Sequence, residues 1–136
     1  MKSIVKKGDS KTIYHRVSTD DIASFKGDTV HEVCSSFVLA RELEWSSRQF
    51  MFDLCEEDEE GIGTSLSVKH ISPAFIGDRL EVLAVVKGFE NGELLCDCLV
   101  KVGERLIAKG RTGQKVLKKK RIERIFSKLG EDEQEG

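Results

Sequence analysis

Three side chains of this 136-residue sequence, Ser36, Glu44 and His70, have the types needed for acid–base or nucleophilic chemistry. A carboxylate can act as a general base or as a nucleophile, and an imidazole can orient a partner or transfer a proton. A hydroxyl can hold water or a substrate. The three groups can act together only if the secondary structure turns them toward one place.

The helix that would carry two of these residues is predicted to begin at Ser35 or Ser36 and to end near Leu54, because the segment contains no Gly or Pro. At 100° per residue, Glu44 lies roughly 200° around the axis from Glu42. One side, expected to face solvent, holds the polar residues Glu42, Ser46, Gln49 and Asp53. The other side holds the mostly apolar group of Phe37, Ala40, Ser47 and Met51 around Glu44.

Glu44 is therefore expected to point into the protein or into a pocket. A buried carboxylate costs several kcal/mol unless it is paired or protonated. A salt bridge with Arg48 or with Arg41 is the structural alternative to a catalytic role. In the functional alternative, Glu44 works with a second polar residue at the same interface.

His70 is the candidate for that second residue. In the predicted strand from Gly63 to Ile71, His70 alternates onto the same face as Leu66 and Val68. This apolar face should cover the helix, so Glu44 and His70 are predicted to meet between helix and sheet. The alternatives are a core histidine with a satisfied hydrogen bond and, for Ser36, a helix N-cap.

The remaining elements predict an α+β fold in which an antiparallel sheet packs on one long helix. A first strand spans Lys11 to Val17, and a short helical turn runs from Ser18 through Phe25 until Gly27-Asp28 ends it. Four strands follow the long helix, with a hairpin at Asn91-Gly92. They are expected at residues 63–71, 80–87, 94–102 and 105–117.

Length and composition limit the class of protein. A chain of 15.3 kDa with 39% hydrophobic residues forms one domain with a real core. We expect a polar lead-in at residues 1–10, the domain at 11–117 and a charged tail at 118–136, basic first and then acidic. The net charge of −2 gives no reason to expect nucleic acid or a membrane as partner.

Cysteine and histidine spacings match no known metal site, so no metal and no cofactor are expected. All four cysteines are predicted to be reduced. Neither a signal peptide nor an apolar stretch of membrane-spanning length is visible, which indicates a cytoplasmic protein.

Two segments resemble the fluoroacetyl-CoA thioesterase-like family of hotdog-fold proteins. Val33 to Trp45 (VCSSFVLARELEW) is similar to the family's helix-start motif, in which a Thr precedes a catalytic Glu by eight positions. Gly63 to Ala74 (GTSLSVKHISPA) is similar to its G-T-x-x-x-V-x-H strand and the turn after it. The resemblance covers roughly residues 11–117.

The resemblance implies a hotdog fold and acyl-CoA thioester hydrolysis. Glu44 and His70 would be catalytic, with Ser36 in the place of the family's Thr. The backbone N–H of Gly63 would hold the thioester oxygen. Because Ser replaces Thr and residues 27–31 show no aromatic lid, the resemblance implies the reaction type and not the fluoroacetyl substrate.

The same resemblance implies a homodimer whose sites lie at the subunit boundary, with Glu44 and His70 coming from one chain or from two. Ser35 and Thr64 are expected to contact substrate. Lys69, Arg79 and the basic run at 115–124 are expected to bind the CoA phosphates.

Two other functions remain open on this fold. One is a non-enzymatic module that binds acyl-CoA or an acyl carrier. The other is a hydratase or dehydratase, which needs a His paired with an acid for proton transfer at the acyl chain, and no such pairing is evident in the sequence.

Overall fold

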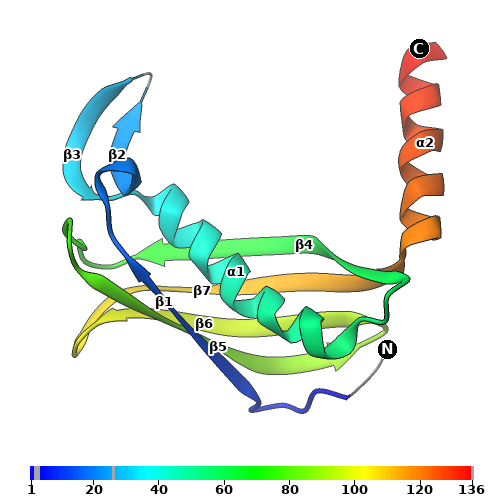
Figure 1. Ribbon diagram of the computed structural model, residues 1–136, viewed down its shortest axis with the longest axis horizontal. Helices are drawn as coiled ribbons and strands as arrows, with labels where there is room; N and C mark the ends of the chain where they lie inside the picture. Colours follow the sequence, from blue (N-terminus) through cyan, green and yellow to red (C-terminus); the bar gives the residue numbers. More distant parts are fainter. Residues whose placement is uncertain (2–3, 26, 136) are drawn as a thin grey trace.

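The computed structural model describes residues 1, 4–25 and 27–135 (Figure 1). Its strands are β1 (Ser10–Arg16), β2 (Ile22–Phe25), β3 (Asp28–Cys34), β4 (Glu59–His70), β5 (Arg79–Glu90), β6 (Glu93–Val102) and β7 (Arg105–Lys118). Its helices are the 3-10 turn η1 (Thr19–Asp21), α1 (Ser36–Leu54) and α2 (Lys119–Glu135). The predicted long helix and the four strands after it are confirmed.

Five strands form one antiparallel sheet in the order β1-β5-β6-β7-β4. The hairpin between β5 and β6 turns at Asn91 and Gly92, whose φ angles of 55° and 78° are those of the predicted tight turn. β1 and β4 are the outer strands, so one side of each has no neighbour in this sheet. The α+β architecture is as predicted.

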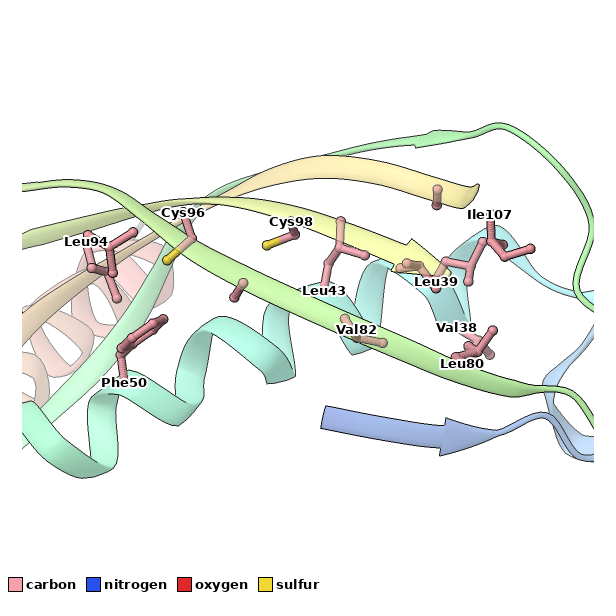
Figure 2. Packing of buried hydrophobic residues seen from close by; sticks show 14 of the residues in the cluster. Val38, Leu39, Leu43, Phe50, Leu80, Val82, Leu94, Cys96, Cys98 and Ile107 are labelled. Carbon is pink, nitrogen blue, oxygen red and sulfur yellow. The ribbon is translucent and has the colours of Figure 1, made fainter. Parts of the chain in front are cut away.

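α1 lies across one face of this sheet (Figure 1). Its side chains Leu39, Leu43 and Phe50 are buried against alternating residues of the strands (Figure 2). The buried strand residues are Leu80, Val82, Ala84 and Val86 on β5 and Leu94, Cys96, Cys98 and Val100 on β6. This alternation is the period-two pattern of strands with one covered face.

The helical turn expected through Phe25 is wrong, because helix stops at Asp21. Ile22 is already extended, at φ −75° and ψ 152°, and β2 then pairs with β3 as a separate two-stranded hairpin. Gly27, at φ +86°, takes the left-handed conformation that a turn requires and glycine tolerates.

The expected solvent stripe of α1 is also wrong in part, since Glu42 and Ser46 are buried. The opposite group was expected inside, yet Phe37 is 72% exposed. On the flank beside Phe37, Trp45 is 47% exposed and Phe52 62%. The sheet covers only one side of the helix, and an ion-pair cluster keeps Glu42 on that side.

This cluster joins β1, η1 and α1. His15 Nε2 lies 2.7 Å from Asp21 Oδ2, its Nδ1 lies 3.5 Å from Glu42 Oε1, and Arg41 lies 3.0 Å from the same Glu42 oxygen. Burial opposes ionisation of Asp21, but hydrogen bonds from the Ser18 backbone and from His15 outweigh it and lower the pKa of that carboxyl. These charges hold α1 against β1.

The charged tail is the helix α2, which leaves the sheet at the end of β7 (Figure 1). No described helix is long and apolar enough to cross a bilayer. In the same residues, no three His, Cys, Asp or Glu side chains gather as metal ligands would.

Candidate active site

Ser36 and His70 form the first half of the candidate site. The helix is capped by Ser35, whose hydroxyl accepts a hydrogen bond of 3.1 Å from the Val38 N–H. Ser36 is thus free of capping, and its Oγ lies 3.0 Å from Nδ1 of His70. Nε2 of His70 lies 3.1 Å from the Ser72 carbonyl oxygen.

These contacts define the tautomer of neutral His70. A carbonyl can only accept a hydrogen bond, so the ring proton lies on Nε2 and points at Ser72. Nδ1 is then an acceptor, and the Ser36 hydroxyl donates to it. The oxygen of Ser36 keeps its lone pairs for a water molecule or a substrate group, and the imidazole can take up the hydroxyl proton.

Glu44 and Gly63 form the second half. The half-buried Glu44 side chain lies directly over Gly63, where an added methyl group would be 3.2 Å from Oε1 of Glu44. The β4–β7 pairing shifts between Gly63 and Ser65, so Thr64 has no partner residue on β7. Such a bulge takes backbone groups out of the regular ladder and makes them available to a ligand.

The Glu44 carboxylate makes no ion pair and no hydrogen bond with any side chain that the structure describes. Arg41 pairs with Glu42, and Arg48 donates to the Gly61 carbonyl at 3.1 Å. The salt bridge that the sequence offered as the alternative is therefore not formed. Glu44 instead lines a cavity of about 390 Å³ together with Arg41, Trp45 and Arg48.

The two halves are separated within one chain. Ser36 and Glu44 are eight residues apart on α1, a distance of about 12 Å along the axis. Gly63 and His70 are seven residues apart on β4, which corresponds to about 23 Å. The prediction that Glu44 and His70 meet is therefore not met inside a single chain, although both residues lie along α1 and β4 as expected.

The residues predicted to bind substrate are scattered. Thr64 stands at the bulge beside Gly63, and Lys69 is exposed on β4. The Ser35 hydroxyl is occupied by the helix cap. Arg79 begins β5 and lies 4.6 Å from the Tyr14 ring of β1. β1 is the edge of the sheet opposite to β4, so Arg79 is not brought to the site.

Gln114 is a site residue that the sequence prediction missed. It pairs with Gly63 across β4 and β7, and its buried Nε2 donates to the Glu44 carbonyl at 3.3 Å and to Ser47 Oγ at 3.0 Å. The amide thus ties the turn of α1 that carries Glu44 to the strand that carries Gly63. A polar Gln at a helix-facing position of the last strand was the available signal.

Comparisons with known proteins identify the family and the fold. The family described as fluoroacetyl-CoA-specific thioesterase, FlK, matches residues 17–120. A thioesterase superfamily member from Thermus thermophilus is 25% identical, with a TM-score of 0.92 and 98% of each chain covered. No curated protein matches the sequence.

Two further solved structures share the fold. A variant of FlK in complex with fluoroacetate and CoA has a TM-score of 0.80 at 19% identity, covering 87% of this chain and 99% of that one. A hot-dog-like protein from Thermanaerovibrio acidaminovorans has a TM-score of 0.82 at 16% identity, covering 90% and 91%. The predicted hotdog fold is confirmed.

Proposed function

Because the chain belongs to the FlK family of fluoroacetyl-CoA-specific thioesterases, we propose that it hydrolyses a small or medium acyl-CoA to the free acid and CoA. Thioester hydrolysis itself follows from the family, and the acyl group is the proposed part. The observation that carries the proposal is the unpaired Glu44 carboxylate over Gly63 at the β4 bulge.

In the proposed reaction, the thioester carbonyl lies between Glu44 and the backbone of Gly63. Glu44 either removes a proton from the attacking water or attacks the carbonyl carbon itself, giving an anhydride that water then opens. The carbonyl oxygen gains negative charge, which backbone N–H groups at the bulge stabilise. The C–S bond breaks, the acid leaves, and the CoA thiolate takes up a proton.

Ser36 and His70 are proposed to complete this site from a second copy of the chain. The outer edge of β4 has no neighbour in its own sheet. If two β4 strands pair antiparallel about a centre at Ser67, with Thr64 left unpaired at the bulge, Gly63 of one copy stands opposite His70 of the other. Glu44 then faces the Ser36–His70 pair across the boundary.

Such a homodimer would also cover apolar surface. Leu66 on β4 is 45% exposed, and Trp45 on the outer side of α1 is 47% exposed. Exposed apolar groups beside an unpaired strand edge favour association with another chain.

Recognition of the CoA phosphates is assigned to cations on the β4 side of the molecule. Lys69 and the basic run at 115–124 are retained for this role, because β4 and β7 are neighbours. Arg79, on the β1 side, would not reach a phosphate bound near Glu44 of its own chain.

The test is the release of free thiol from a panel of acyl-CoA substrates. Wild-type protein is expected to turn over short or medium chains, whereas Glu44→Gln and His70→Ala are each expected to lose about 100-fold or more of kcat. Glu57→Gln, in the exposed loop before β4, is the matched control and should keep full activity.

Two outcomes would contradict the proposal. Saturable acyl-CoA binding without thiol release across the panel would indicate a binding module. Conversion of an enoyl-CoA without thiol release would indicate a hydratase. Thermal unfolding of each variant shows whether a loss of activity is a loss of fold.

A further inference from the structure

The C-terminal helix α2 leaves an apolar stripe uncovered. Ile122, at its base, is buried against the body, and the Lys119 N–H donates to the Asp58 carbonyl at 2.8 Å. Beyond this base the helix extends away from the sheet (Figure 1). Ile125 is 39% exposed, Phe126 60% and Leu129 55%. The spacing of three, four and seven residues from Ile122 places all of them on one side of the helix.

The charges along α2 are in the wrong order for a helix that stands alone. Lys119 to Lys128 contains five basic residues and one acidic residue. The acidic residues Glu131, Asp132, Glu133 and Glu135 follow toward the C-terminal end. The helix macrodipole favours the reverse order. Lys120, Arg124 and Lys128 also follow one another at intervals of four residues. Like charges at this spacing repel each other and destabilise the helix further.

A partner with the opposite charge order would remove both disadvantages. An anionic membrane or a nucleic acid would attract the first half of α2 and repel the second half. Another α2 that runs in the opposite direction places the basic half of each helix beside the acidic half of the other. A parallel partner would place like charges together.

We propose that α2 pairs antiparallel with α2 of a second copy of the chain, in an interface separate from the one proposed at β4. The midpoint of Lys119–Glu135 is Ser127, and Ile125 and Leu129 are equally far from it. In an antiparallel pair centred there, Ile125 of one copy packs on Leu129 of the other, with Phe126 near the centre. The contact is self-complementary, as a twofold interface must be. Its apolar contact uses none of Ser36, Glu44, Gly63 and His70, whereas its basic half overlaps the run at 115–124 assigned to the CoA phosphates.

Disulfide trapping between two full-length chains tests the pairing directly. One chain carries Ile125→Cys and the other Leu129→Cys, with Cys55→Ser in both to remove the most accessible native thiol. The antiparallel pair brings these two positions within the short Cα–Cα distance that a disulfide requires. We expect the mixed disulfide to exceed the two homodisulfides at least severalfold after co-expression and mild oxidation.

The control reverses the charges of α2 on one chain or on both. Reversal replaces the five basic residues with Glu and the four terminal acidic residues with Lys, and the resulting order suits the macrodipole, so the helix is not put at risk. Reversal on both chains should preserve the mixed disulfide, and reversal on one chain should abolish it.

Three results would overturn the proposal: no mixed disulfide, a mixed disulfide no more abundant than the homodisulfides, or a mixed disulfide that one-sided reversal leaves unchanged. The Ile125→Cys, Leu129→Cys and Cys55→Ser chains keep the basic run at 115–124 intact and should keep thioesterase activity, so failure of the pairing is distinguishable from failure of the proposed function. The charge-reversed chains are scored by the disulfide alone, because they alter residues assigned to the CoA phosphates.

Discussion

The Glu44 carboxylate carries the proposed chemistry because nothing described in its own chain neutralises it. Its two cationic neighbours on α1 are engaged elsewhere, Arg41 with Glu42 and Arg48 with the Gly61 carbonyl. A carboxylate that is half-buried and unpaired is available to act on a ligand. Its position depends on the absence of a side chain at Gly63.

Gly63→Ala tests that dependence. The new methyl group would lie 3.2 Å from Oε1 of Glu44, so the carboxylate must move by a few tenths of an ångström. The flexible end of Glu44 can move at little cost to stability, but a displaced reacting group is costly to catalysis. We expect kcat to fall about tenfold or more, with a nearly unchanged melting temperature.

Gly88→Ala is the matched control, since a methyl group at this β5 position would meet nothing within 4 Å. Full activity in Gly63→Ala, or an equal loss in both variants, would contradict the position assigned to Glu44.

Two buried cysteines are expected to make the stability of the protein depend on pH above pH 9. Burial raises the pKa of the Cys34 thiol to about 11, and burial followed by the neighbouring Cys98 raises that of Cys96 to about 12, from an ordinary value of 9.0. The folded protein therefore favours the protonated thiols. Their contribution to stability is complete below pH 9 and is lost as the pH rises toward these folded-state values, because the unfolded chain releases the protons earlier.

Urea unfolding between pH 8 and pH 10.5 measures this loss. For Cys96, the free energy of unfolding lost by pH 10.5 is expected to be about 2 kcal/mol. In the Cys96→Ala variant, the free energy of unfolding should therefore decrease less steeply with pH than in wild type over this range. Parallel curves for the two proteins would show that Cys96 titrates alike in the folded and unfolded states.

At the start of the helix α1, one serine caps the helix and the next is proposed to act in the site. Ser35 caps the helix, and Ser36 contacts His70. The sequence offered both as caps, because either hydroxyl could precede the same helical run. Only the structure shows which of the two is left for the site.

Ser35→Ala should therefore lower stability, whereas Ser36→Ala should lower activity. Loss of the cap is expected to lower the free energy of unfolding by about 1 kcal/mol and to leave kcat unchanged. Loss of the Ser36 hydroxyl is expected to lower kcat with little change in stability. Chemical denaturation and thiol-release kinetics on both variants provide the comparison, and the reverse pattern would assign the roles the other way round.

The sheet and the long helix could be predicted because their signals are local. Alternation along β5 and β6, the Asn91-Gly92 turn and the uninterrupted α1 segment each depend on neighbouring residues. The burial of Glu42 could not be predicted from local signals, because its partner His15 comes from the distant strand β1. The β2–β3 hairpin could not be predicted, because the helix-start signal at Ser18 leads only to the single turn Thr19–Asp21 and not to a helix through Phe25.

The candidate site was predicted in part for the same reason. The face of β4 that carries His70 and the side of α1 that carries Glu44 follow from strand and helix periods. Gln114 was missed because its role depends on the pairing of β7 with β4, a contact between residues far apart in sequence. Because Glu44 and His70 lie apart along α1 and β4, we propose that one chain supplies only half of each site.

The whole molecule is accordingly proposed to act as a homodimer joined at β4. Each subunit would provide the Glu44 and Gly63 half of one site and the Ser36 and His70 half of the other. Two inactive variants, Glu44→Gln and His70→Asn, should then complement one another and restore activity when their chains are mixed.

The thioesterase activity of an equal mixture of these two variants shows whether each site is shared between two chains. Random exchange makes half of the dimers mixed, and each mixed dimer has one site with both Glu44 and His70 intact. We expect roughly a quarter of wild-type thioesterase activity to return from two inactive proteins. If native mass spectrometry shows mixed dimers but activity stays at the level of the separate variants, the shared site is contradicted.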